Sequence, residues 1–75
     1  MNKIRRKQLS ELLEEMESIL SKLEDICSDE EDSFENIPEN LQGSERASES
    51  EEAIDQMNDA ISSIEDAISC IEELV

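Results

Sequence analysis

The sequence contains no histidine, tryptophan or tyrosine, and it has only one phenylalanine, one proline and one glycine. Histidine is the commonest general base for activating a nucleophile, and it also completes the di-metal sites of helix bundles. No lysine is placed to activate one of the many serines instead. The sequence therefore predicts no enzyme activity, no metal site and no cofactor.

Positive charge is also scarce, because 22 acidic residues stand against 6 basic ones and give a formal net charge of -16. A chain of this charge is repelled by DNA, RNA and anionic membranes. The acidic run SDEEDS at 28–33 lacks the alternating ligands and the sixth-position glycine of a calcium loop. The predicted partners are basic proteins, cations or another copy of the chain, with no direct nucleic-acid binding and no membrane binding.

Long apolar runs are missing as well, and no segment approaches the length of a membrane span. The basic start MNKIRRKQ leads into LSELLEEMES and not into the apolar stretch of a signal peptide. Cys27 and Cys70 form no C-x-x-C pair of the kind found in metal or redox sites. We expect a protein of the host cell cytoplasm with both thiols reduced.

What the sequence does contain is an apolar pattern that repeats every seven positions in both halves. In the second half, position a holds Ile54, Ile61, Ile68 and Val75, position d holds Met57, Ile64 and Ile71, and position g holds Ala53, Ala60, Ala67 and Leu74. In the first half, position a holds Leu13, Leu20, Cys27 and Phe34, position d holds Leu9, Met16 and Leu23, and position g holds Leu12, Ile19 and Ile26. Each apolar face is therefore three positions wide, which is broader than a two-stranded coiled-coil seam and typical of a bundle.

These repeats predict a single all-α domain over 1–75, with helix one at about 3–33, a cap or turn at about 34–46 and helix two at about 47–74. A short connection makes two long helices antiparallel, and this hairpin holds Cys27 and Cys70 too far apart for a disulfide. One hairpin of 75 residues buries little surface and leaves part of both apolar faces exposed. We therefore expect a homo-oligomer, in the simplest case a homodimeric four-helix bundle.

The segment ENIPENLQGSER, residues 35–46, separates the two repeats. Pro38 ends or restarts a helix, and Gly43 permits a positive backbone φ. Ser44, or alternatively Ser48 one turn later, can cap the second helix. The segment is longer than a plain turn needs. We expect a structured cap over the end of the bundle, built on Phe34, Ile37 and Leu41.

Polar residues of the same segment are candidate ligand contacts. These residues are Asn36, Asn40, Gln42, Ser44 and Arg46. Amides and a guanidinium near a helix N-terminus are suited to an anion such as a phosphate. The alternative interpretation is that the segment only closes the hairpin.

Positions e and f of the second helix collect carboxylates, whereas positions b and c are nearly neutral and form the other flank. The candidate partner surface consists of Asp59, Glu65, Asp66 and Glu72. The 22 carboxylates, spread over helices of about 45 Å, approach the charge density of duplex DNA, about one charge per 1.7 Å. We interpret the acidic flank as a surface for a partner, with an ordinary solvated helix face as the alternative.

The few cations cluster at the start of the first helix, where Lys3, Arg5, Arg6 and Lys7 stand. Positive charge at a helix N-terminus opposes the helix dipole, so this placement calls for a reason. In an antiparallel hairpin the cluster is expected to lie beside Glu72 and Glu73 at the other end of the chain. The alternative is an arm for a nucleic acid or an acidic partner.

The basic start, the acidic first helix, the words NIPENLQGSERASESEEAI and the heptad-patterned acidic end resemble a group of small uncharacterised acidic helical-hairpin proteins of Firmicutes phages, prophages and mobile elements. The likeness covers nearly the whole chain, and PENLQGSER is its most specific part. The resemblance implies a helical hairpin and a mobile-element setting without an established activity. It favours an anti-defence or other host-directed role.

Three functional hypotheses follow from these observations. The first is a non-enzymatic, homo-oligomeric acidic binding protein of phage type, which inhibits a host protein by stoichiometric sequestration. The second is a sponge-like protein that holds a nucleotide-like small molecule between protomers, near the central segment. The residues of this hypothesis are Arg46 with Asn40, Gln42 and Ser44. The third is a purely architectural helical protein.

Overall fold

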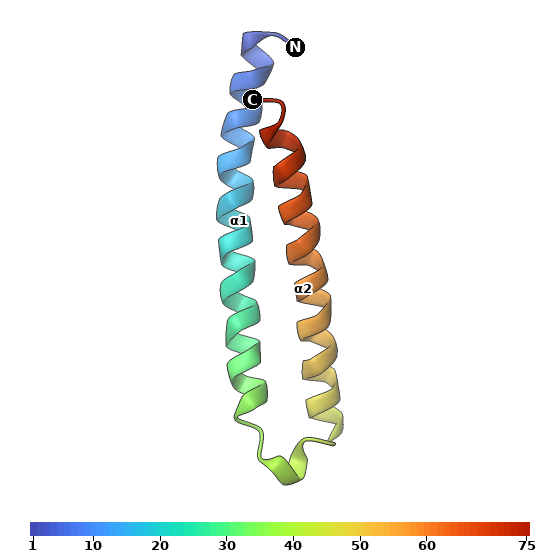
Figure 1. Ribbon diagram of the computed structural model, residues 1–75. Helices are drawn as coiled ribbons and strands as arrows, with labels where there is room; N and C mark the ends of the chain where they lie inside the picture. Colours follow the sequence, from blue (N-terminus) through green and yellow to red (C-terminus); the bar gives the residue numbers. More distant parts are fainter.

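The computed structural model describes residues 1–75 as two long antiparallel α-helices joined by a short loop (Figure 1). Helix α1 runs from Lys3–Glu35, helix α2 from Glu45–Glu72, and a 3-10 helix, η1, spans Glu39–Leu41 between them. The structure has no β-strand, so the predicted all-α hairpin is confirmed. The molecule is a rod that measures 59 × 14 × 13 Å.

Both ends of α1 are set by the residues that flank it. The Asn2 side chain accepts a hydrogen bond of 2.8 Å from the backbone N–H of Arg5, one of the first-turn donors that the helix cannot satisfy itself. The helix continues past the predicted boundary at residue 33 and ends at Glu35. Ile37 precedes Pro38, a position that disfavours helical geometry, and the helix therefore ends just before it.

Helix α2 begins at Glu45 because Ser44 caps it: the Ser44 side chain accepts a hydrogen bond of 3.2 Å from the Ala47 N–H. Ser44, and not Ser48, is thus the N-cap. Gly43 permits a positive φ but does not adopt one, since no residue of the chain has a positive φ. The chain reverses through η1 with ordinary right-handed backbone angles instead, such as φ -64° and ψ -23° at Gln42.

The two helices pack along a narrow seam formed by heptad positions a and d. Cys27, Ala47 and Ile68 are buried there, with 3%, 0% and 8% of their surface exposed. Arg6, at an a position near the start of α1, is exposed. The other a and d residues inside the helices are half-buried, and these are Leu9, Leu13, Met16, Leu20, Leu23, Glu30, Phe34, Ser50, Ile54, Met57, Ile61, Ile64 and Ile71. One hairpin thus covers two of the three predicted apolar positions and leaves the third exposed in α1.

Two hydrogen bonds between the helices fix their register. The Cys27 thiol lies 3.7 Å from Asn58 Oδ1, and the Ser50 hydroxyl donates to Glu30 at 3.2 Å. Cys27 and Cys70 are both free, the first buried and the second exposed. In this register the first turns of α1 project beyond the end of α2 (Figure 1). The basic cluster therefore extends past Glu72 and does not lie beside it.

The loop covers the end of the hairpin only in part. Phe34 and Ile37 are half-buried, but Leu41 is 49% exposed and does not fold over the helix ends as expected. The loop is instead held by local hydrogen bonds, such as the Leu41 N–H to the Pro38 carbonyl oxygen at 2.8 Å. Neither helix combines the length and apolar character that crossing a membrane requires.

Candidate functional site

The loop between the helices encloses a cavity of about 280 Å³, which we call the loop hollow. It is lined by Ser33, Asn36, Ile37, Pro38, Leu41, Ser44 and Arg46. Of the five polar residues predicted as ligand contacts, the structure brings Asn36, Ser44 and Arg46 together here. Ser33 joins them from the last turns of α1, and no sequence pattern pointed to it because it lies within a regular helical run.

The other two predicted contacts do not line the loop hollow. The Gln42 side-chain amide donates a hydrogen bond of 2.8 Å to the Ile37 carbonyl oxygen, which holds the loop in shape. Asn40 is exposed within η1. Ser44 accepts the cap hydrogen bond from the Ala47 N–H through its hydroxyl oxygen, and its O–H group can still donate. The donors that line the hollow are the Arg46 guanidinium, the Asn36 amide and the hydroxyls of Ser33 and Ser44. Only one of these groups carries a positive charge, so the hollow is a modest site.

One long side of the hairpin is acidic. Because each helical residue advances by about 100°, position e borders the seam next to a, and position g borders it next to d on the opposite side. From Glu17 onward the e positions of both helices are exposed glutamates with one exception, Asn58. We call this surface the acidic side, and it consists of Glu17, Glu24, Glu31, Glu51, Glu65 and Glu72.

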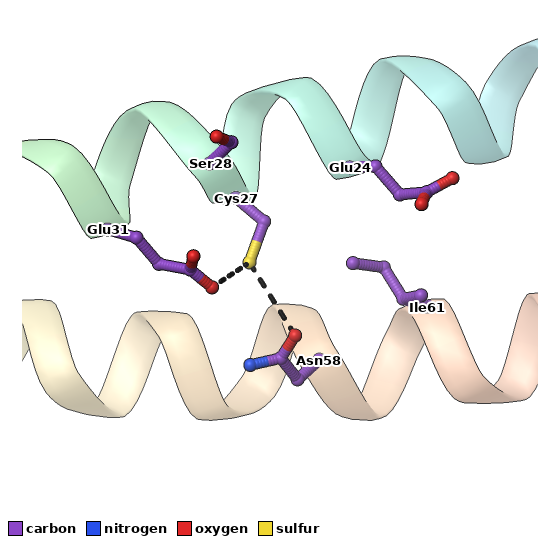
Figure 2. A pocket seen from close by; sticks show the side chains of 6 residues that line it. All are labelled: Glu24, Cys27, Ser28, Glu31, Asn58 and Ile61. Carbon is purple, nitrogen blue, oxygen red and sulfur yellow. Dashed lines mark hydrogen bonds between the residues drawn. The ribbon is translucent and has the colours of Figure 1, made fainter.

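A second cavity, of about 220 Å³, opens on the acidic side and is called the thiol hollow (Figure 2). Its lining residues are Glu24, Cys27, Ser28, Glu31, Asn58 and Ile61. Glu24 and Glu31 come from α1 and Asn58 comes from α2, and all three occupy e positions. The hollow therefore shows that the e positions of the two helices share one side of the hairpin.

The Cys27 thiol points into the thiol hollow, where it lies 3.6 Å from Glu31 Oε1 and 3.7 Å from Asn58 Oδ1 (Figure 2). Burial raises the pKa of the Cys27 thiol, and the hydrogen bond to Glu31 and the negative charge of Glu31 raise this pKa further. A protonated thiol is a poor nucleophile and a poor metal ligand. Cys27 thus acts as a small packing residue of the seam.

The predicted acidic surface is only partly on the acidic side. Glu65 and Glu72 belong to it, whereas Asp59 and Asp66 occupy f positions, further round on the outer face of α2. Position b lies between e and f on the helix, so the expectation that b belongs to the neutral flank is wrong. The sequence reasoning also missed the glutamates that α1 contributes, although the heptad of the first helix places them at e. They are Glu17, Glu24 and Glu31.

The opposite long side carries the g positions, which are exposed in α1 and partly buried in α2 at Ala53 and Ala67, and is called the apolar side. It consists of Leu12, Ile19 and Ile26 in α1 with Ala53, Ala60 and Ala67 in α2.

Comparisons with models of protein families, with curated proteins and with solved structures found no match. The proposals below rest on the contrast between these two sides.

Proposed function

We propose that the chain is a non-enzymatic acidic binding protein that holds a basic host protein against its acidic side and so sequesters it stoichiometrically in the host cytoplasm. The protein works as a homodimer, and its role is that of a phage or mobile-element inhibitor directed against host defence. The resemblance to small acidic proteins of Firmicutes mobile elements supports the setting. The segregation of charge on the hairpin supports the mode of binding.

The observation that carries this proposal is the row of carboxylates along one side, which only Asn58 interrupts. Beyond the first two turns of α1, positions e and b of both helices contain carboxylates and polar residues but no cation. Clustered like charges destabilise a helix pair, so a purely architectural protein gains nothing from such a row. A basic partner relieves this repulsion on binding and associates faster through electrostatic steering.

A capture experiment with matched charge changes tests the proposal. The wild-type protein, the variant Glu24→Gln/Glu65→Gln/Glu72→Gln and the control Glu11→Gln/Asp25→Asn/Asp32→Asn are immobilised and exposed to a Firmicutes host lysate. The control removes the same charge from f positions on the outer face of α1. A target retained by the wild type and the control at moderate salt, but lost by the first variant, supports the proposal. Equal retention by all three contradicts it.

The loop hollow supports a second candidate, the capture of a nucleotide-like small molecule, because Arg46, Asn36 and Ser44 converge on one cavity. The cavity of about 280 Å³ lies just below the range of ordinary ligand pockets, about 300–1,000 Å³. Substituting Arg46→Ala is expected to abolish binding of nucleoside phosphates measured by calorimetry, and to leave protein capture unchanged. Nucleotide binding by the wild type that Arg46→Ala removes would favour this candidate.

A further inference from the structure

The apolar side exposes aliphatic side chains that the hairpin itself does not use. Leu12, Ile19 and Ile26 are 43%, 55% and 58% exposed, and they span about 21 Å of α1. The chain exposes 5757 Å², about 1,100 Å² more than the roughly 4,700 Å² typical of a folded monomer of its mass. A standard protein interface covers about 800 Å² of each partner. The excess therefore has the size of one partner's share of an interface.

The apolar side is also electrically neutral, unlike the rest of the hairpin. At positions g and c of α1 and α2 the cations and the carboxylates are equal in number: Arg5, Lys22 and Arg46 against Glu15, Asp29 and Glu49. The formal net charge of -16 thus lies entirely outside this side. Another strongly acidic chain meets the least repulsion when it approaches here. This favours a second copy over a basic partner as the occupant.

The surface of α1 is complementary to itself about Ile19, the midpoint of the helix Lys3–Glu35. Leu12 and Ile26 lie one heptad before and one heptad after it, and Glu15 and Lys22 flank it with opposite charges. A two-fold interface brings each residue against one that is equally far beyond the axis. An antiparallel second α1 therefore sets Leu12 over the partner's Ile26. Glu15 lies four residues before Ile19 and Lys22 three residues after it, so Glu15 is offset from the partner's Lys22 by one residue, about 1.5 Å along the axis, which two long side chains can span.

The same arrangement accounts for the part of α1 that α2 does not reach. The first turns of α1 project beyond α2 (Figure 1) and carry Arg5 and Arg6. In an antiparallel pair centred on Ile19, these turns lie level with the acidic last turns of the second α1, which contain Asp32. The small alanines of α2 lie on the same side of the hairpin as Ile19, and they let the second copy approach closely.

We propose that two copies of the chain associate through their apolar sides, with α1 antiparallel to the second α1 and the two-fold axis at Ile19. The product is a four-helix bundle whose two acidic sides face outward in opposite directions. This deepens the self-association included in the proposed function and does not depend on target binding. Because the tests below leave the acidic side intact, their failure and the failure of target capture are distinguishable.

The first test mixes two charge-reversed variants. The proposed dimer has two equivalent sites where residue 15 of one copy lies near residue 22 of the other. In a Glu15→Lys homodimer each site contains two cations, and in a Lys22→Glu homodimer each site contains two carboxylates. Each variant alone is expected to dissociate about tenfold more readily than the wild type. An equimolar mixture restores opposite charges at both sites, so native mass spectrometry is expected to show mainly heterodimer. Random mixing, with unchanged dissociation of either variant, overturns the antiparallel pairing.

The second test places a thiol on the symmetry axis. In a Cys70→Ser background, Ile19→Cys is expected to form a disulfide between copies on mild oxidation, because the two Cα atoms lie within about 7 Å of each other. The matched Ser18→Cys variant, at a position that faces outward, is expected to stay reduced. Helicity measured by circular dichroism shows that both variants remain folded. Equal cross-linking of both variants, or of neither, contradicts the proposed axis.

Discussion

The acidic side and the apolar side flank the same seam, yet they differ in every property that governs association. The acidic side carries a row of glutamates from both helices, with Asn58 as its one neutral member after Ser10. The apolar side carries leucine and isoleucine beside alanines, and its charges cancel. A rod this thin has no interior apart from its seam, so the contrast separates the two contacts that we propose, one with a copy of the chain and one with a basic partner.

The two sides are compared with the seam between them. Removing a side chain from the seam is expected to have the largest effect on the free energy of unfolding. Ile68→Ala removes a side chain that is 8% exposed and is expected to lower the free energy of unfolding by about 2–4 kcal/mol. The same change at Ile4, which is 71% exposed, is expected to lower it by less than about 0.5 kcal/mol. Urea titration monitored by circular dichroism measures both. Equal losses would show that the seam does not hold the hairpin together.

A smaller effect is expected from removing charge on the acidic side. Glu31 and Asn58 face each other across the seam and line one hollow. Glu24 lies one heptad before Glu31 and Glu65 lies one heptad after Asn58, so in antiparallel helices these two glutamates face each other in the same way. Neutralising one glutamate of this pair by Glu24→Gln is expected to raise the free energy of unfolding by about 0.2–0.5 kcal/mol, because the like charges on the two helices repel each other. On the apolar side, Glu15→Gln is expected to lower the free energy of unfolding at concentrations where the proposed dimer forms. Equal shifts for the two variants would remove the distinction between the sides.

The smallest effect is a dependence of stability on alkaline pH. The pKa of Cys27 is raised in the folded chain by burial and by Glu31, so the folded state keeps the thiol proton where the unfolded chain begins to lose it. This contribution is complete below the ordinary thiol pKa of 9.0 and is lost as the pH rises through the folded value. In a Cys70→Ser background, the urea midpoint is expected to fall more steeply above about pH 9 than in the same background with Cys27→Ala.

The comparison with Cys27→Ala is needed because the rest of the chain can also contribute to a change of stability with pH. Groups other than Cys27 are the same in both proteins, so the difference between the two pH profiles reports on this thiol. Parallel profiles would mean that the thiol has the same pKa in the folded and unfolded chains. In that case the thiol hollow would be open to solvent.

The seven-residue repeats were enough to predict the hairpin, because the period of apolar residues determines which face a helix buries. Leu20, Ile61 and Ile64 lie in the seam as their a and d positions require. The spread of charge over two sides was not predicted in full. The sequence reasoning examined only the outer positions of the second helix, and it left out Glu24 and Glu31 of the first.

The loop was less predictable than the helices, because its shape depends on a few local hydrogen bonds. Gln42 bonds to the Ile37 carbonyl oxygen and turns away from the loop hollow, a choice that composition does not determine. The turn forms through η1 with right-handed backbone angles, so Gly43 needs no positive φ. A Cβ added at Gly43 meets no atom within 4 Å, which means that an alanine would fit there.

The elongated shape affects how the molar mass of this protein must be measured in solution. A body 59 Å long and 14 Å across has more hydrodynamic friction than a sphere of equal mass. It therefore leaves a gel-filtration column early, where a compact protein of larger mass would elute. A single chain can then pass for a dimer on a column calibrated with compact standards, so its stoichiometry is better taken from sedimentation equilibrium, which depends on mass and not on form.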